Sequence, residues 1–292
     1  MQLIIEMKNI GGHKMKDVKA INLNDKFSIG GNNRLTLIAG PCTIESRELC
    51  FEVANELKRI CEKLNINYIF KASFDKANRS SINSSRGLGI EKGLEILKEI
   101  KETLNIPVTT DVHESWQCEK VAEVVDILQI PAFLCRQTDL LIAAAKTGKI
   151  VNVKKGQFVA PWDMKNVVSK LEESGTDKIL LCERGTSFGY NNLVVDMTGL
   201  LEMREFGYPV VFDATHSVQK PGGNGLTTGG NRKFVFPLMK AALAVGVDAI
   251  FVEVHPDPEN AHSDGPNQLY LKDIEHILTS AIQINDLVKS LN

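Results

Sequence analysis

The stretch Tyr68-Ile69-Phe70-Lys71-Ala72-Ser73-Phe74-Asp75-Lys76-Ala77-Asn78-Arg79-Ser80-Ser81 places a short apolar run directly before two lysines, an arginine and several hydroxyl groups. The run at 68–72 has the length and composition of a buried β-strand. The polar residues after it have the chemistry that phosphate oxygens require: a guanidinium fork, an amide and hydroxyls together. This stretch therefore predicts a strand whose carboxyl end holds a small anionic ligand.

The same pattern of an apolar, β-branched run followed by a helical segment recurs along the chain. The predicted strands are Leu35–Ala39, Tyr68–Ala72, Pro107–Val112, Ile127–Ile130, Ile150–Val153, Lys178–Cys182, Pro209–Phe212 and Ala249–Val254. Amphipathic helices are predicted at Glu45–Leu64, Glu91–Leu104, Met164–Glu173 and Leu271–Leu291. Strict alternation favours a (β/α)₈ TIM barrel over a doubly wound sheet, because no Gly-rich dinucleotide turn follows the first strand.

Size and composition bound the domain organisation. A chain of 292 residues with 43% hydrophobic content can bury one large core. We predict a catalytic barrel over residues 35–292 and an N-terminal extension over residues 1–34. In the extension, Leu3–Met7 and Val18–Leu23 flank Gly11-Gly12 and are expected to form a β-hairpin that closes the bottom of the barrel.

Charge and hydropathy exclude several classes of protein. The formal net charge is -2, so the basic cluster is a local device for small anions and no basic stripe suggests a nucleic-acid partner. No signal peptide or membrane-spanning run is recognisable, so the protein is expected to be cytoplasmic. The six cysteines lack paired zinc spacing and are interpreted as reduced thiols.

Polar residues stand at or just beyond the carboxyl end of each predicted strand. They are Cys42, Lys71, Asp111, Gln129, Lys154, Arg184, His216 and Glu253. Each alone could be a satisfied polar residue on a barrel rim. Eight together predict one active-site mouth, because strand ends of a parallel barrel aim their side chains at one point.

Four residues of this mouth have the chemistry of metal ligands, namely Cys42, His216, Glu253 and Asp264. A thiolate, an imidazole and carboxylates suit a divalent ion such as zinc, iron(II) or manganese. A buried structural thiol is the alternative for Cys42. His255 and His262 are alternative ligands, because they lie close in sequence to Glu253 and Asp264.

The chain resembles the 3-deoxy-D-manno-octulosonate 8-phosphate synthase family from about Leu35 to the C-terminus, whereas the first 34 residues lie outside the resemblance. Besides the stretch at 70–81, the resemblance is carried by Ala39–Cys42, Thr110–Glu114, Gln129–Phe133, Asn152–Phe158, Arg184–Tyr190 and Asp213–Ser217. The family is a barrel that condenses phosphoenolpyruvate with arabinose 5-phosphate in the synthesis of a lipopolysaccharide precursor. Cys42 matches its metal-dependent class, as do His216, Glu253 and Asp264.

The resemblance also implies roles for the other residues of the mouth. It places Arg184, Lys154 and the Ala132 N–H at the phosphate of phosphoenolpyruvate, and Lys76 and Lys154 near its carboxylate. Gln129, Lys71 and Ser73 would line the pocket, and Asn78, Arg79 and Ser80 would take the sugar phosphate. The candidate catalytic residues are Lys76, Asp111, Lys154, His216 and Asp264. The resemblance further implies a homotetramer in which an adjacent subunit supplies the sugar-phosphate loop.

Two other functions remain possible at this stage. 3-Deoxy-arabino-heptulosonate 7-phosphate synthase shares the phosphoenolpyruvate site but takes erythrose 4-phosphate, and it typically has Lys-Pro-Arg-Thr-Ser where this chain has Lys-Ala-Asn-Arg-Ser-Ser. A non-catalytic sugar-phosphate-binding regulator would lack the residues that carry chemistry, which are present here. The Gly/Pro-rich loops at 219–230 and 256–268 are expected on the active face, where they could close over substrate.

Overall fold

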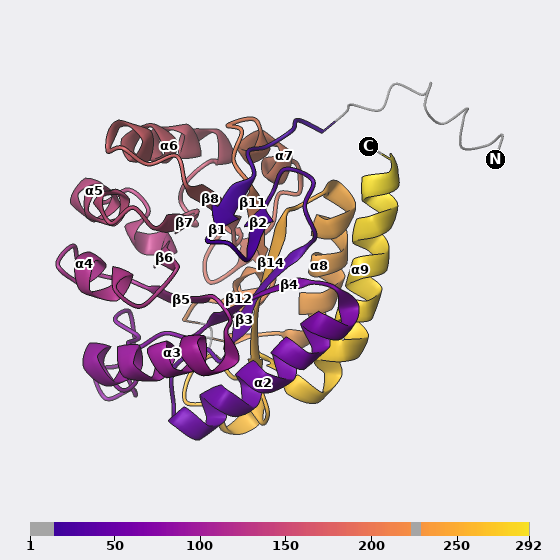
Figure 1. The fold of residues 1–292 in the computed structure, drawn as a ribbon. Helices are drawn as coiled ribbons and strands as arrows, with labels where there is room; N and C mark the ends of the chain where they lie inside the picture. Colours follow the sequence, from indigo (N-terminus) through magenta and orange to yellow (C-terminus); the bar gives the residue numbers. More distant parts are fainter. Residues whose placement is uncertain (1–14, 223–228, 292) are drawn as a thin grey trace.

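The structure is a computed structural model that describes residues 15–222 and 229–291. Its centre is a closed barrel of parallel strands, with the helices packed outside (Figure 1). The barrel strands are β3 (Thr36–Gly40), β4 (Asn67–Lys71), β5 (Val108–Asp111), β6 (Ile127–Ile130), β7 (Ile150–Lys154), β8 (Ile179–Glu183), β11 (Val210–Asp213) and β14 (Ala249–His255). Each pairs with the next, and β14 closes the ring by pairing with β3. The predicted (β/α)₈ barrel is confirmed, with each strand within a residue or two of its expected bounds.

The helices alternate with the strands as predicted. They are α2 (Arg47–Leu64), α3 (Ile90–Leu104), α4 (Gln117–Ala122), α5 (Thr138–Lys146), α6 (Met164–Glu173), α7 (Thr198–Arg204), α8 (Val235–Val245) and α9 (Ile274–Leu291). Helix α2 begins two residues later than predicted because Ser46 is its N-cap, accepting a hydrogen bond from the Leu49 N–H at 3.1 Å. Helix α9 also begins later, because Leu271–Asp273 form a separate 3-10 turn.

Short antiparallel pairs decorate the loops of the barrel. Strand β9 (Thr186–Ser187) pairs with β10 (Leu193–Val194), and β12 (Gln219–Lys220) pairs with β13 (Gly229–Gly230). Strand β15 (Leu269–Tyr270) extends the sheet in parallel beside the end of β14. The strands of the barrel are almost entirely buried, as expected for a parallel sheet covered on both faces.

A hairpin of β1 (Ile21–Leu23) and β2 (Phe27–Ile29) crosses the amino-terminal end of the barrel, near its centre in Figure 1. The Asn24 amide donates to Asp126 at 2.8 Å, and the Lys26 ammonium donates to the Asn105 carbonyl at 2.7 Å. Both acceptors precede barrel strands, so the hairpin covers the face opposite the active site. The observed partner of Ile21–Leu23 is Phe27–Ile29, whereas the partner predicted from the sequence, Leu3–Met7, lies outside the described residues.

This hairpin is expected to contribute strongly to stability. Leu23 is 1% exposed, so Leu23→Ala should lower the free energy of unfolding by about 2 to 5 kcal/mol through lost burial and a cavity. Urea denaturation monitored by circular dichroism measures the loss. Asp25→Ala, in the exposed turn of the same hairpin, should change stability by less than about 0.5 kcal/mol. Equal effects of the two variants would show that the hairpin is not part of the cooperative core.

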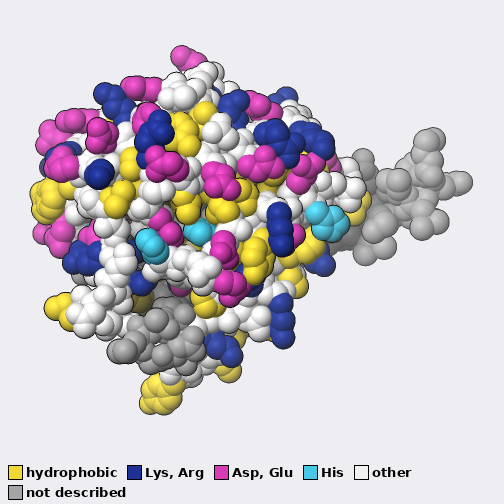
Figure 2. Space-filling view, turned by 90° about the horizontal axis from the view of Figure 1, so that it is seen from below, with side chains coloured by type: hydrophobic (Ala, Val, Ile, Leu, Met, Phe, Trp, Pro, Cys, Tyr) yellow, Lys and Arg dark blue, Asp and Glu magenta, His cyan; other side chains and the backbone are white. Residues whose placement is uncertain are grey.

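One face of the molecule carries charges of both signs in a mixed distribution. On the face drawn in Figure 2, lysine and arginine side chains alternate with aspartate and glutamate. Such mixed charge does not form the basic stripe that a nucleic acid requires. Within the described part of the chain, every helix is too short or too polar to cross a membrane.

Candidate active site

A cavity of about 670 Å³ opens at the carboxyl ends of the barrel strands. Of the residues predicted for the site, the following line it: Cys42, Lys71, Lys76, Asn78, Arg79, Ser80, Asp111, Gln129, Ala132, Lys154, Arg184, His216 and Asp264. Ser73 and Glu253 are fully buried beside it. The barrel therefore gathers into one site residues that are spread over more than 200 positions of sequence.

Ser73, buried beside the cavity, forms hydrogen bonds with two residues that line it. Its hydroxyl is hydrogen-bonded to Asp111 Oδ1 and accepts a hydrogen bond from the Lys76 ammonium at 3.1 Å. The other carboxylate oxygen of Asp111 lies 2.9 Å from His113 Nε2. Burial opposes ionisation of Asp111, but the contact with His113 and the nearby Lys71 and Lys76 hold its pKa well below the usual range. Asp111 is therefore an ionised acceptor at the cavity wall.

Two residues of the segment at 213–216, Asp213 and Thr215, position other residues of the site through hydrogen bonds. Asp213 accepts hydrogen bonds from the Lys154 ammonium at 2.6 Å and the His216 backbone at 2.9 Å, and its Oδ2 lies 2.7 Å from His216 Nδ1. Burial opposes ionisation of Asp213, but His216 and Lys154 lower its pKa strongly. The Thr215 hydroxyl accepts the Glu253 N–H at 2.7 Å. Asp213 thus fixes the imidazole so that Nε2 is free to face the cavity.

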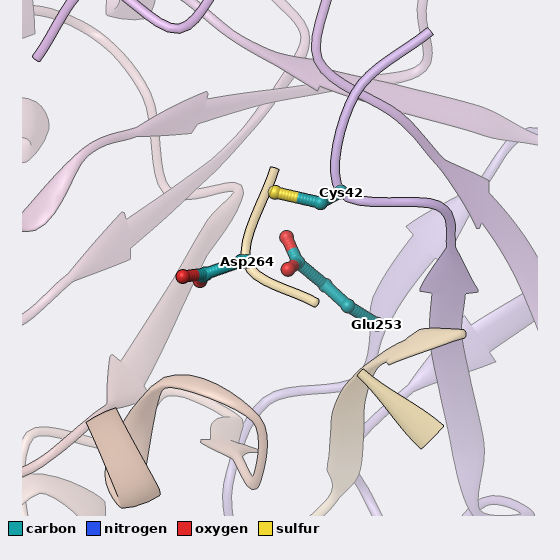
Figure 3. Close-up of side chains that lie close together, drawn as sticks. All are labelled: Cys42, Glu253 and Asp264. Carbon is teal, nitrogen blue, oxygen red and sulfur yellow. The ribbon is translucent and has the colours of Figure 1, made fainter. Parts of the chain in front are cut away.

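The candidate metal ligands come from separate segments, as Figure 3 shows: Cys42 from the loop after β3, Glu253 from β14, and Asp264 from the loop after β14. One ligand atom from each of these three residues lies within 4.8 Å of the others. His216 Nε2 is 3.6 Å from Glu253 Oε1 and 3.5 Å from Asp264 Oδ2. The structure therefore brings the predicted quartet together.

These residues fit a divalent cation, both by the chemistry of their ligand atoms and because one buried carboxylate oxygen lacks a partner among the described residues. Glu253 is 0% exposed, and its Oε2 has no hydrogen-bond partner among the described residues. A buried carboxylate oxygen without a partner is costly, and a cation would satisfy it. Burial, reinforced by the charge of Glu253, raises the pKa of Cys42 to about 12, so binding of an ion would displace the thiol proton.

Two lysines share the other oxygen of Glu253. The ammonium of Lys71 lies 3.2 Å from Oε1 and that of Lys76 lies 4.0 Å away. Burial alone would raise the pKa of Glu253, but His216 and these lysines lower it to about 2. Glu253 therefore stays ionised, and Oε2 is the oxygen left for a cation.

Arg184 and Ala132 each provide a donor at the mouth that is available for a ligand. Arg184 is 5% exposed, and its Nη1 has no hydrogen-bond partner among the described residues. Burial lowers the pKa of Arg184, but a guanidinium remains charged. The amide of Ala132 begins a 3-10 turn (Ala132–Leu134), so it has no acceptor within that turn. Gln129 Oε1, which is an acceptor, also has no hydrogen-bond partner among the described residues. This region is suited to hold a multiply charged anion.

The predicted sugar-phosphate loop lines the same cavity. Arg79 donates to the Ser263 hydroxyl at 2.8 Å and to the His262 carbonyl at 3.2 Å, which ties this loop to the loop that carries Asp264. Asn78 and Ser80 are exposed beside it. All three therefore line the cavity of their own chain, and a contribution of the same loop from an adjacent subunit stays a prediction.

The two histidines considered as alternative metal ligands face another residue. His255 and His262 lie 3.5 and 3.7 Å from the carboxylate of Glu45.

Gln219 was assigned no role from the sequence, but it contacts two residues of the site. Gln219 contacts both Arg184 and Asp264. The sequence signal for Gln219 was its place three residues after His216. Residues 219, 221 and 222 of the first predicted lid loop line the cavity, whereas its residues 223–228 lie outside the described residues.

Fold and site together define a class: a (β/α)₈ enzyme whose mouth combines an anion-binding region with a candidate metal centre. The DAHP synthetase I family matches residues 13–290. A 2-dehydro-3-deoxyphosphooctonate aldolase of Fusobacterium nucleatum is 65% identical over 277 residues, which cover 95% of this chain and 99% of the relative. Proteins of the same name from a Cyanothece species and Rickettsia bellii are each 59% identical, over 90% and 93% of this chain and 97% and 98% of their own lengths.

The chain belongs to the 2-dehydro-3-deoxyphosphooctonate aldolase family, within the DAHP synthetase I family. The broader family is named after the heptulosonate synthases, whereas the relatives of high identity carry the octonate name. The relatives are the more specific guide, because they match nearly their whole length at 59 to 65% identity. The family predicted from the sequence is confirmed.

Proposed function

We propose that this chain is a transferase that condenses phosphoenolpyruvate with D-arabinose 5-phosphate and water to give 3-deoxy-D-manno-octulosonate 8-phosphate and phosphate. The observation that carries the proposal is the 65% identity over 99% of a relative named for this activity. The cavity supports it, because one volume holds the anion-binding region around Arg184 and the loop of Asn78, Arg79 and Ser80. Two phosphorylated substrates need two such regions.

The reaction forms one carbon–carbon bond and releases one phosphate. C3 of phosphoenolpyruvate attacks the aldehyde carbon of the sugar, and the aldehyde oxygen takes up a proton. Water adds its oxygen at C2 and gives up its protons, and the bond between C2 and the phosphate oxygen then breaks. The electron pair leaves with phosphate and C2 becomes a ketone, so no oxidant is needed.

The residues of phosphoenolpyruvate binding act mainly as fixed charges and donors. Arg184 and the amide of Ala132 hold the phosphate, while Lys76 and Lys154 face the carboxylate and the charge that develops during attack. Their positions are set before the reaction, Lys154 by Asp213 at 2.6 Å and Lys76 by Ser73 at 3.1 Å. Preorganised charge of this kind supplies a large part of many enzymic rate enhancements.

The sugar is held by the loop at 78–80 and by the wall around Asp111. Asn78, Arg79 and Ser80 would bind the 5-phosphate. The pKa of Asp111 lies well below its usual range, so the carboxylate is ionised and only weakly basic, and we assign it as a hydrogen-bond acceptor for sugar hydroxyls rather than as an acid or base in proton transfer. Lys71 and Gln129 also line the cavity.

A divalent ion, which we propose to be zinc, iron(II) or manganese, would be held by Cys42, His216, Glu253 and Asp264. When bound, such an ion supplies Lewis acidity that can orient the aldehyde or activate the water. Asp213 fixes the ring of His216 for this purpose, and Lys71 limits the negative charge of Glu253.

We further propose that the enzyme is a cytoplasmic homotetramer acting in lipopolysaccharide precursor synthesis. Large apolar side chains are exposed around the loops after β6, β7 and β8, including Phe133, Phe158, Trp162 and Phe188, which are 54 to 72% exposed. Exposed apolar surface of this kind is a candidate for contact with another subunit. Analytical ultracentrifugation measures the assembly.

The function is tested by phosphate release from phosphoenolpyruvate with each candidate aldehyde. We expect kcat/KM with arabinose 5-phosphate to exceed that with erythrose 4-phosphate at least about 100-fold, because the site fails to pair its buried polar groups with the wrong acceptor. Mass spectrometry of the eight-carbon product confirms bond formation. A preference for erythrose 4-phosphate would show a heptulosonate synthase instead, and binding of sugar phosphates without phosphate release would indicate a regulator.

A further inference from the structure

One amide side chain joins the two halves of the site. Gln219 is the first residue of β12 and follows the 3-10 turn His216–Val218. Its Oε1 accepts a hydrogen bond from Arg184 Nη2 at 2.5 Å, and its Nε2 donates to Asp264 Oδ2. Gln219 therefore connects the arginine proposed to bind phosphate with a carboxylate proposed to bind metal.

The chemistry of its partners fixes the orientation of this amide. A guanidinium can only donate hydrogen bonds, and a carboxylate can only accept them. Only one of the two amide orientations satisfies both Arg184 and Asp264, because the flipped orientation would set donor against donor and acceptor against acceptor. Gln219 thus holds Arg184 and Asp264 in a defined relation to each other.

Asp264 depends on such support. Its backbone has φ 56°, the left-handed region that costs energy for a residue other than glycine. The Asn267 N–H donates to its carbonyl at 2.9 Å, and the Asn267 amide lies 3.4 Å from Oδ1. Because Gln219 holds Oδ2, the direction of the carboxylate is set by these two amides and not by the loop alone.

We infer that Gln219 is a positioning residue that couples anion binding at Arg184 to metal binding at Asp264. An anion that engages the unpartnered Nη1 of Arg184 restrains the guanidinium, the guanidinium restrains the Gln219 amide, and the amide restrains Asp264. Because coupling between two binding equilibria is reciprocal, metal at Asp264 strengthens anion binding by the same factor. The inference rests on the proposed function, which assigns a ligand to each end of the link.

The test compares the affinity of metal-free protein for cobalt(II) with and without saturating phosphoenolpyruvate, followed by the thiolate-to-cobalt absorption. In the native chain we expect phosphoenolpyruvate to tighten cobalt binding about tenfold. In Gln219→Met, which keeps the length of the side chain but forms neither hydrogen bond, the ratio should fall below about twofold. Cobalt affinity without phosphoenolpyruvate should also fall about tenfold, as is typical when a supporting partner of a ligand is removed.

The matched control is Lys220→Met, the next residue of β12, which is exposed and does not line the cavity. It should retain the native ratio. A native ratio in Gln219→Met, or a ratio of one in the native chain, would overturn the coupling while leaving the proposed function intact. Failure of the native chain to bind cobalt or phosphoenolpyruvate at all would instead remove the proposed sites and the inference with them. Circular dichroism melting shows that each variant is folded.

Discussion

Removal of divalent metal should lower phosphate release from phosphoenolpyruvate and arabinose 5-phosphate by about 1000-fold, since a bound ion supplies several kcal/mol of transition-state stabilisation. Activity should return when zinc, iron(II) or manganese is added. Cys42→Ala should show the same loss without recovery, because the thiol lies within 4.8 Å of ligand atoms of Glu253 and Asp264. Chelation, metal analysis and steady-state kinetics measure the effect.

Cys118→Ala is the matched control for the thiol. Cys118 is also buried and unpaired, but it lies in α4 and does not line the cavity. Its variant should keep both the metal content and most of the activity, although it can lose stability. Full activity after chelation, with metal shown to be absent, would make Cys42 a packing residue and would refute the metal centre.

Arg184→Met should lower kcat/KM for phosphoenolpyruvate about 1000-fold, because truncating one partner of a buried charge-assisted contact costs about 2 to 5 kcal/mol. Arg184 is 5% exposed and its Nη1 has no partner among the described residues, so this donor is available for a phosphate oxygen. The KM for arabinose 5-phosphate should change little. Arg184→Lys should recover only part of the loss, because an ammonium cannot form the bidentate contact.

Stability separates this loss from misfolding. Burial disfavours the charged guanidinium and lowers its pKa, so an apolar replacement removes a buried charge, and we expect a cooperative thermal unfolding transition that shows a folded variant. Arg47→Met, which removes an exposed arginine of α2 that pairs with Glu99 of α3, should leave kinetics for both substrates unaltered. A rise in KM for the sugar rather than for phosphoenolpyruvate would place Arg184 at the wrong phosphate.

Much of the fold was readable from local patterns. The apolar run at 68–72 and its seven counterparts predicted the barrel strands, because a strand buried on both faces must be continuously apolar. The first residues of helices were predicted less accurately. Ser46 is the N-cap of α2, so the helix begins after it, and Leu271–Asp273 form a separate 3-10 turn before α9. These shifts of two or three residues reflect hydrogen bonds at helix ends, which hydrophobic periodicity does not report.

The site was partly predictable for the same reason. A barrel converts the position of a residue at a strand end into a position in one mouth, so Cys42, Lys71, Lys154 and Arg184 could be placed together from sequence order alone. The roles of Gln219 and Glu45 could not be predicted from the sequence, because neither residue stands at the end of a barrel strand. Their contacts with Asp264 and His262 arise where long loops fold back over the mouth.

The sequence by itself determined the alternation of strands and helices, the chemistry of the residues at strand ends and, through its motifs, the family. Only the tertiary structure decided which atoms meet: that Asp213 orients His216, that Gln219 bridges Arg184 and Asp264, and that Arg79 contacts the loop that carries Asp264. The physical reason is the separation in sequence over which each kind of interaction acts. Propensity and periodicity act between neighbours, whereas a hydrogen bond between residues dozens of positions apart depends on how the closed barrel and its loops pack in three dimensions.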